Sequence, residues 1–152
     1  MFQGFGPIGV PGFWVITAIL LSTGALARQT STEFDGEGYR VILPRGVTGT
    51  TKHVIDFDIA TFRKDDGTQL LGAYSGLHPD FNERGSRAEK INGLNALRRN
   101  STNSNKQKCS DVLVTIRGSK NFAFSIHFWY CLDSDVDVKQ AESIIHSIKP
   151  EP

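Results

Sequence analysis

The two cysteines are the residues whose chemistry the sequence defines best. Cys109 and Cys131 are the only cysteines in the chain, and they enclose a stretch rich in β-branched and aromatic residues. If residues 119–121 form the loop of a hairpin, Cys109 faces Cys131 across the two strands. Directly opposed Cβ atoms lie roughly 4.5–5.5 Å apart, close to the span of a disulfide. We therefore predict a disulfide; two buried thiols are the alternative, and the lack of a CxxC pair disfavours a metal site.

The same register divides the hairpin into two faces. One face is apolar at every position (Val112 opposite Phe128, Val114 opposite Ile126, Ile116 opposite Phe124). The other face carries His127 and is more polar. This alternation is typical of an antiparallel sheet with one side in the core and one side in water.

The remaining histidines and acidic residues give no metal or catalytic motif, and no cofactor is predicted. The four histidines lack metal-ligand spacing (His53, His78, His127 and His146). We expect His127 to be a partly buried sheet residue, because no GxSxG turn supplies a nucleophile and a disulfide leaves no thiolate. Asp56 and Asp58 are expected on the wet face of a strand, with Ile55, Phe57 and Ile59 on its other face. The alternating aspartates of "DSDVD" (133–137) fail the calcium-loop pattern and favour helix capping.

One loop has the composition of a binding groove. Tyr74, His78 and Phe81 lie in "AYSGLHPDF", where a strand ends, and His127 could face the same space. Loops held by a rigid sheet often carry binding residues. An ordinary strand-to-loop turn is the alternative.

Positive charge is concentrated between residues 84 and 120, where nine Lys or Arg stand against two acidic residues. The candidate partner-binding patch consists of Arg84, Arg87, Arg98, Arg99, Lys106, Lys108 and Lys120. Such a patch could bind an acidic protein or anionic lipid headgroups. An ordinary solvated face is the alternative, and no motif supports nucleic acid.

The chain reads as a series of strands followed by one helix. Strands are expected at 39–43, 53–63, 69–76 and 91–99, with loops at 46–52 and 78–89, a turn at 64–68 and an exposed connection at 99–108. A helix capped by Ser134 or Asp135 should end before Pro150 and carry an apolar stripe (Ala141, Ile144, Ile145 and Ile148). These elements predict an α+β fold, with an antiparallel sheet of about six strands packed against the C-terminal helix.

An apolar segment precedes this domain. The first charged residue is Arg28, and Ala25-Leu26-Ala27 matches a small-x-small cleavage site. Residues 1–27 are predicted to be a signal peptide cleaved after Ala27 or an uncleaved anchor formed by residues 7–27. Residues 28–37 are expected to be a flexible linker and residues 38–152 a single domain. Both alternatives place the domain in the periplasm or another extracytoplasmic compartment.

The order of elements resembles that of PsbP-like and DcrB-like exported domains. The resemblance rests on "GYRVILPRG" near the start, on the hairpin of "VLVTIRG" and "FAFSIHFWY", and on the helical "AESIIHSIK". It covers most of residues 38–149 and concerns the fold. It implies a non-catalytic accessory subunit, envelope protein or binding module.

We therefore expect a non-enzymatic envelope protein that binds a protein partner, as an accessory subunit of an integral membrane complex or as a periplasmic immunity-type inhibitor of a toxin. The alternative from another class is a small-ligand-binding protein or an enzyme that uses a groove near His78 and His127.

Overall fold

The computed structural model describes residues 31–117 and 123–151, which form ten strands and one helix. The elements are β1 (Thr32–Gly36), β2 (Tyr39–Leu43), β3 (Val47–Val54), β4 (Phe57–Lys64), β5 (Gln69–Gly76), β6 (Arg87–Ile91), β7 (Leu94–Thr102), β8 (Lys108–Arg117), β9 (Ala123–Leu132), α1 (Asp135–His146) and β10 (Lys149–Pro150). The described chain is therefore mostly β. The predicted α+β fold with about six strands is wrong, although a C-terminal helix does pack on a sheet.

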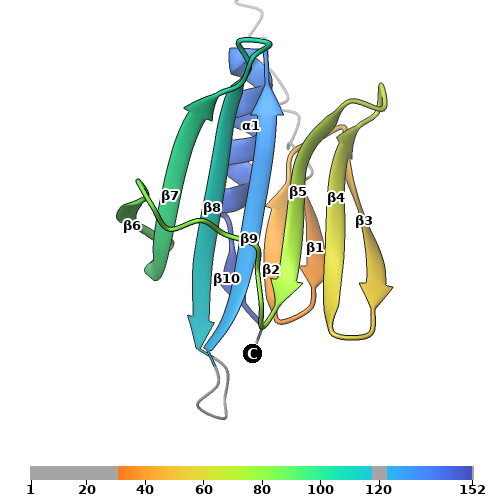
Figure 1. The fold of residues 1–152 in the computed structure, drawn as a ribbon. Helices are drawn as coiled ribbons and strands as arrows, with labels where there is room; N and C mark the ends of the chain where they lie inside the picture. The colour runs from red at the N-terminus through yellow and green to blue at the C-terminus, as the bar shows by residue number, and fades with distance from the viewer. Residues whose placement is uncertain (1–30, 118–122, 152) are drawn as a thin grey trace, which may run out of the picture.

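The strands form two antiparallel sheets. The larger sheet has seven strands in the order β3-β4-β5-β9-β8-β7-β6, and the smaller one has the order β1-β2-β10. In Figure 1 the large sheet faces the viewer, and α1 and the small sheet lie behind it. We call the side of the large sheet that faces α1 the inner face and the opposite side the outer face.

The β8–β9 hairpin has the predicted register. Cys109 pairs with Cys131, Val112 with Phe128 and Val114 with Ile126. The two cysteines form a disulfide with an S–S distance of 2.07 Å. The apolar side of the hairpin is the inner face, where the valine, isoleucine and Phe128 side chains are buried against the helix stripe. Both predictions are confirmed.

The helix is also formed as predicted. The Ser134 side chain caps it and accepts hydrogen bonds from the backbone N–H groups of Val136 and Asp137. The whole predicted stripe is buried (Ala141, Ile144, Ile145 and Ile148). Beyond the helix, β10 pairs with β2, so the chain end joins the small sheet.

Residues 32–36, which the sequence analysis places in a flexible linker, form β1. This strand pairs with β2 along all five residues. The ring of Phe34 packs against Phe62 and covers Gly49, where the missing side chain leaves it room. The strand is stabilised by these tertiary contacts, because its own sequence has no alternating apolar pattern.

The expected loop at 46–52 and the strand at 53–63 are also corrected. Residues 47–54 form β3, and the chain turns at Ile55 and Asp56 before β4 begins. The two faces predicted for this strand are wrong, since Ile55 is 99% exposed and Asp58, expected on the wet face, is only 6% exposed. Of the two turn residues only Asp56 favours turns, and it stands beside an isoleucine, so the local turn signal was weak.

The predicted strand at 91–99 is two strands, β6 and β7, joined by Asn92 and Gly93. Both residues have positive φ angles, 47° and 82°. An Asn-Gly pair favours this tight hairpin turn, so the signal was present in the sequence. The expected connection at 99–108 is a hairpin whose strands extend to Thr102 and from Lys108.

Candidate functional site

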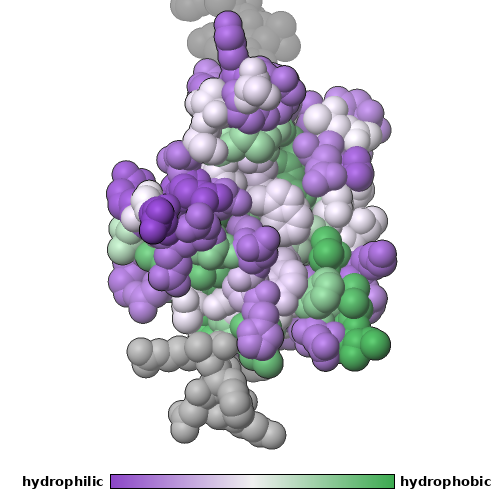
Figure 2. Space-filling model, in the orientation of Figure 1, coloured by the Kyte–Doolittle hydropathy of each residue, from purple (hydrophilic) through white to green (hydrophobic). Residues whose placement is uncertain are grey.

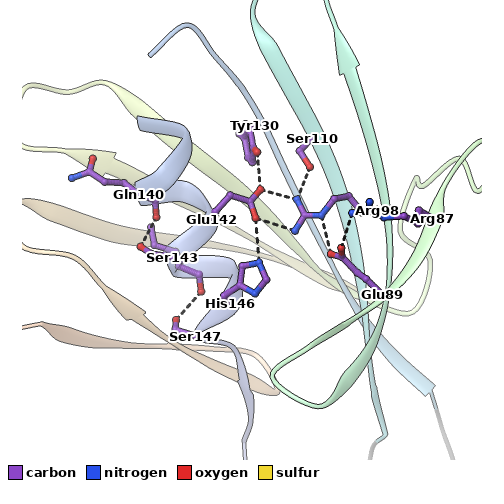
Figure 3. A network of polar contacts seen from close by, with 11 residues as sticks. Arg87, Glu89, Arg98, Ser110, Tyr130, Gln140, Glu142, Ser143, His146 and Ser147 are labelled. Carbon is purple, nitrogen blue, oxygen red and sulfur yellow. Dashed lines mark hydrogen bonds and ion pairs between the residues drawn. The ribbon is translucent and has the colours of Figure 1, made fainter. Parts of the chain in front are cut away.

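A buried polar cluster joins the helix to the inner face of the large sheet (Figure 3). Its centre is Arg98 on β7, which is only 7% exposed. The Arg98 Nε donates to Glu89 Oε1 at 2.8 Å, and its two Nη atoms donate to the Glu142 carboxylate at 2.7 and 2.9 Å. Nη1 also donates to the Ser110 hydroxyl at 2.9 Å. One guanidinium therefore connects β6, β8 and α1.

The acidic side of this cluster is Glu142 on the helix. It also accepts a hydrogen bond from the Tyr130 hydroxyl at 2.7 Å and lies 3.5 Å from the His146 ring. Burial, together with the neighbouring Glu142, raises the pKa of Tyr130 well above its usual range. Burial opposes the charge of Arg98, but the carboxylates outweigh it and raise its pKa. The cluster is fully paired and holds α1 on the sheet.

An open hollow of about 600 Å³ lies beside this cluster. It lies between α1 and the inner face of β6–β9. Its lining includes Arg87, Lys108, Val138 and His146. Lys108 forms an ion pair with Asp135, and Arg87 lies 3.4 Å from Glu89. The charged groups that line the hollow are therefore largely neutralised by their neighbours.

The predicted groove residues lie on the outer face. His127 contacts Phe81 and Trp129, each with ring centroids 5.5 Å away, and Tyr74 is its neighbour on β5. His78 is exposed in the segment that crosses this face between β5 and β6 (Figure 1). The structure thus brings His127 together with Phe81 and Tyr74. The His127 and Phe81 rings pack edge to face, whereas the Tyr74 ring stacks on Phe57, and none of these three side chains lines the hollow beside the Arg98 cluster.

His127 also has a charged partner. Its Nε2 lies 3.2 Å from Asp111 Oδ1, and the other Asp111 oxygen accepts from Arg99 at 2.9 Å. Burial lowers the pKa of His127 and outweighs the hydrogen bond to Asp111, which acts in the opposite direction. The ring is therefore held mostly neutral as part of the sheet surface.

The predicted basic patch does not share one face. Arg98 points inward and is buried, whereas Arg99 points to the outer face beside Asp111. Arg87 and Lys108 line the inner hollow, and Arg84 and Lys106 are exposed in turns. Lys120 lies outside the described residues. Successive side chains of a strand point to opposite faces of the sheet. Basic residues that are close together in the sequence therefore lie on different sides of the molecule.

A group of exposed apolar side chains marks one end of the molecule. Ile55 is 99% exposed, Leu77 59% and Val54 39%. Val54 pairs with Phe57, and Phe57 pairs with Gly76, which directly precedes Leu77. We call these three residues, Val54, Ile55 and Leu77, the apolar end. It lies where Figure 2 shows hydrophobic atoms at the lower right.

A second hollow of about 610 Å³ adjoins the apolar end. It is lined by Val54, Ile55 and Phe57 on one side and by Asp35 of β1 on the other. Within it, His53 Nδ1 lies 2.8 Å from the buried carboxylate of Asp58. This region was not predicted, because Ile55 was expected to share a strand face with Phe57 and Ile59.

Two further findings concern candidate metals and membrane spans. In residues 31–117 and 123–151, no group of three or more His, Cys, Asp or Glu could hold a metal ion. Within the same ranges no helix is both long and apolar enough to cross a bilayer. The predicted signal peptide or anchor, residues 1–27, lies outside the described part of the chain.

Neither a family model nor a curated protein matches the sequence. The resemblance to PsbP-like and DcrB-like domains therefore stays a prediction.

Proposed function

We propose that this chain is a non-enzymatic protein of the cell envelope that binds a protein partner through its apolar end. The observation that carries the proposal is the exposure of Ile55, which is 99% accessible beside Val54 and Leu77. Burying one such side chain is worth about 1.5–3 kcal/mol. Exposed apolar side chains that cluster, rather than stand singly, are typical of interaction surfaces.

The polar groups centred on Arg98 and on His127 support the same choice. Arg98, Glu142 and Tyr130 are engaged with one another, and His127 is engaged with Asp111 and two aromatic rings. Catalysis needs groups that stay free to meet a substrate. These groups instead connect elements of the fold, which favours a binding role.

An extracytoplasmic location is part of the proposal. The Cys109–Cys131 disulfide is consistent with an oxidising compartment. If residues 7–27 stay as an anchor, the four residues 28–31 would hold the domain within about 14 Å of the bilayer. An accessory subunit of a membrane complex would then be the role; cleavage after Ala27 would give a free periplasmic binding protein.

A photocrosslinking amino acid at Ile55, introduced into the full chain in its native host, tests the proposal. We expect one discrete adduct, which disappears when Val54→Asp or Leu77→Asp is added. The matched control places the same crosslinker at Val136, which is 66% exposed at the start of α1. The same adducts from both positions, or none from position 55, would overturn the proposal. An adduct of twice the chain mass would identify self-association instead.

A further inference from the structure

The outer edge of β3 offers a second interaction surface. Among residues 31–117 and 123–151, β3 is the terminal strand of the large sheet and pairs only with β4. Figure 1 shows it as the outermost strand on its side of the sheet. Along such an edge, alternate residues direct unpaired backbone N–H and C=O groups outward, ready for another strand.

The other sheet edges in the described ranges carry features that discourage pairing. β6 has five residues, three of them charged (Arg87, Glu89 and Lys90), and β1 has Glu33 and Asp35. β10 is two residues long and contains Pro150. In contrast, β3 runs for eight residues, "VTGTTKHV", with no Pro and with Lys52 as its single Lys, Arg, Asp or Glu, and its register with β4 is regular. Short length, charge and Pro are the usual protections of an edge.

We propose that a second copy of this chain pairs with β3 in antiparallel orientation, about a two-fold axis at Thr51. In this register Thr50 faces Lys52 of the second copy, and Thr48 faces Val54 of the second copy. The charged Lys52 lies off the axis, so the two lysines do not oppose each other. The half-exposed Val54 gains an apolar neighbour in the Thr48 methyl group, and both copies keep their inner faces on the same side.

This inference goes beyond the proposed function. The pairing ends at Val54, so Ile55 and Leu77 stay outside it and remain accessible to a different partner. The two surfaces share Val54, but they can be tested separately because Thr50 belongs only to the pairing and Leu77 only to the apolar end. A variant at Thr50 should leave crosslinking from position 55 unchanged, and a variant at Leu77 should leave self-association unchanged.

Sedimentation equilibrium of the full chain, kept in mild detergent because of its apolar N-terminus, tests the pairing. Thr50 is exposed, so its substitution should leave the fold intact. We expect Thr50→Lys to weaken the dimer by about 2- to 30-fold, because two like-charge pairs form across the axis. Thr50→Glu should strengthen it by a similar factor, since Glu would face Lys52. The matched controls, Ala88→Lys and Ala88→Glu on the β6 edge, should change nothing.

Crosslinking provides an independent readout of the register. Both native cysteines are engaged in the disulfide, so Thr51→Cys supplies one free thiol per chain. In the proposed dimer the two thiols meet at the axis, and a short bifunctional thiol reagent should join the two chains. Ala88→Cys should not crosslink. A monomer at all concentrations, or a dimer that responds equally to the Thr50 and Ala88 variants, would overturn the proposal. Weakening by both Thr50 variants would overturn the register at Thr51.

Discussion

Arg98 and Arg99 are adjacent in the sequence and lie on opposite faces of the same strand. Arg98 is buried on the inner face and binds two carboxylates, one of them on the helix. Arg99 is partly exposed on the outer face and binds Asp111 beside His127. The same side chain thus serves as a connection between elements on one face and as a surface group on the other. The comparison indicates that the contribution of an arginine to stability here depends on whether the fold buries its side chain.

The largest expected effect comes from removing the inner charge. Arg98→Met keeps the apolar stem but leaves Glu89 and Glu142 without their buried partner. We expect the free energy of unfolding to fall by roughly 3–5 kcal/mol. Urea denaturation followed by circular dichroism measures this loss.

Arg99→Met is the matched control on the outer face. Its pair with Asp111 is partly solvated, so its loss should cost about 0–1 kcal/mol. Equal losses for the two variants would contradict the distinction between the faces.

The disulfide on the outer face is a covalent link between strands, whereas the Arg98 ion pairs link elements on the inner face. It links β8 to β9 across a sequence separation of 22. Replacing both cysteines by Ala should lower the free energy of unfolding by about 3 kcal/mol, mainly because the unfolded chain gains freedom. The measurement is urea denaturation of the double variant beside the wild type with and without reductant. Reduced wild type should match the double variant, and a loss below about 1 kcal/mol would show that the strand pairing alone holds this end.

The smallest effect is the pH response of His127. Burial lowers its pKa in the folded state, so the unfolded chain takes up a proton first as the pH falls. The contribution of His127 to stability should be complete above about pH 7 and decrease as the pH falls below about 6.5. His127→Gln should flatten the change in unfolding free energy between about pH 7.5 and 5.5. His78→Gln, at an exposed position, should leave the wild-type response in place; an unchanged slope in His127→Gln would contradict the assignment.

The parts of the fold that could be predicted are those in which local chemistry and tertiary packing agree. Between residues 112–116 and their partners 124–128, the β8–β9 hairpin is apolar on one side, so only one register buries that side, and this register places Cys109 opposite Cys131. The helix has a capping serine and an apolar stripe of matching period. The Asn92-Gly93 pair is also a recognisable hairpin-turn signal. Because this turn was not predicted, one strand was expected where β6 and β7 form.

Other elements depend on contacts between residues far apart in the sequence. β1 exists because β2 pairs with it and because Gly49 on β3 leaves space for Phe34. The turn at Ile55 and Asp56 has only Asp56 as a turn-favouring residue, and the pairing of β3 with β4 fixes its position. Neither feature has a strong local signal, because the stabilising partners lie elsewhere in the chain.

The sequence by itself determined the alternation of the β8–β9 hairpin, the cysteine pairing and the face of the helix that is buried, since these follow from periods of two and 3.6 residues. The tertiary structure decided how the charges are used. It buried Arg98 between Glu89 and Glu142, left Arg99 at the surface, and exposed Ile55 at the end of β3. The physical reason is that burial is a property of the assembled sheets and helix, and no single segment carries that information.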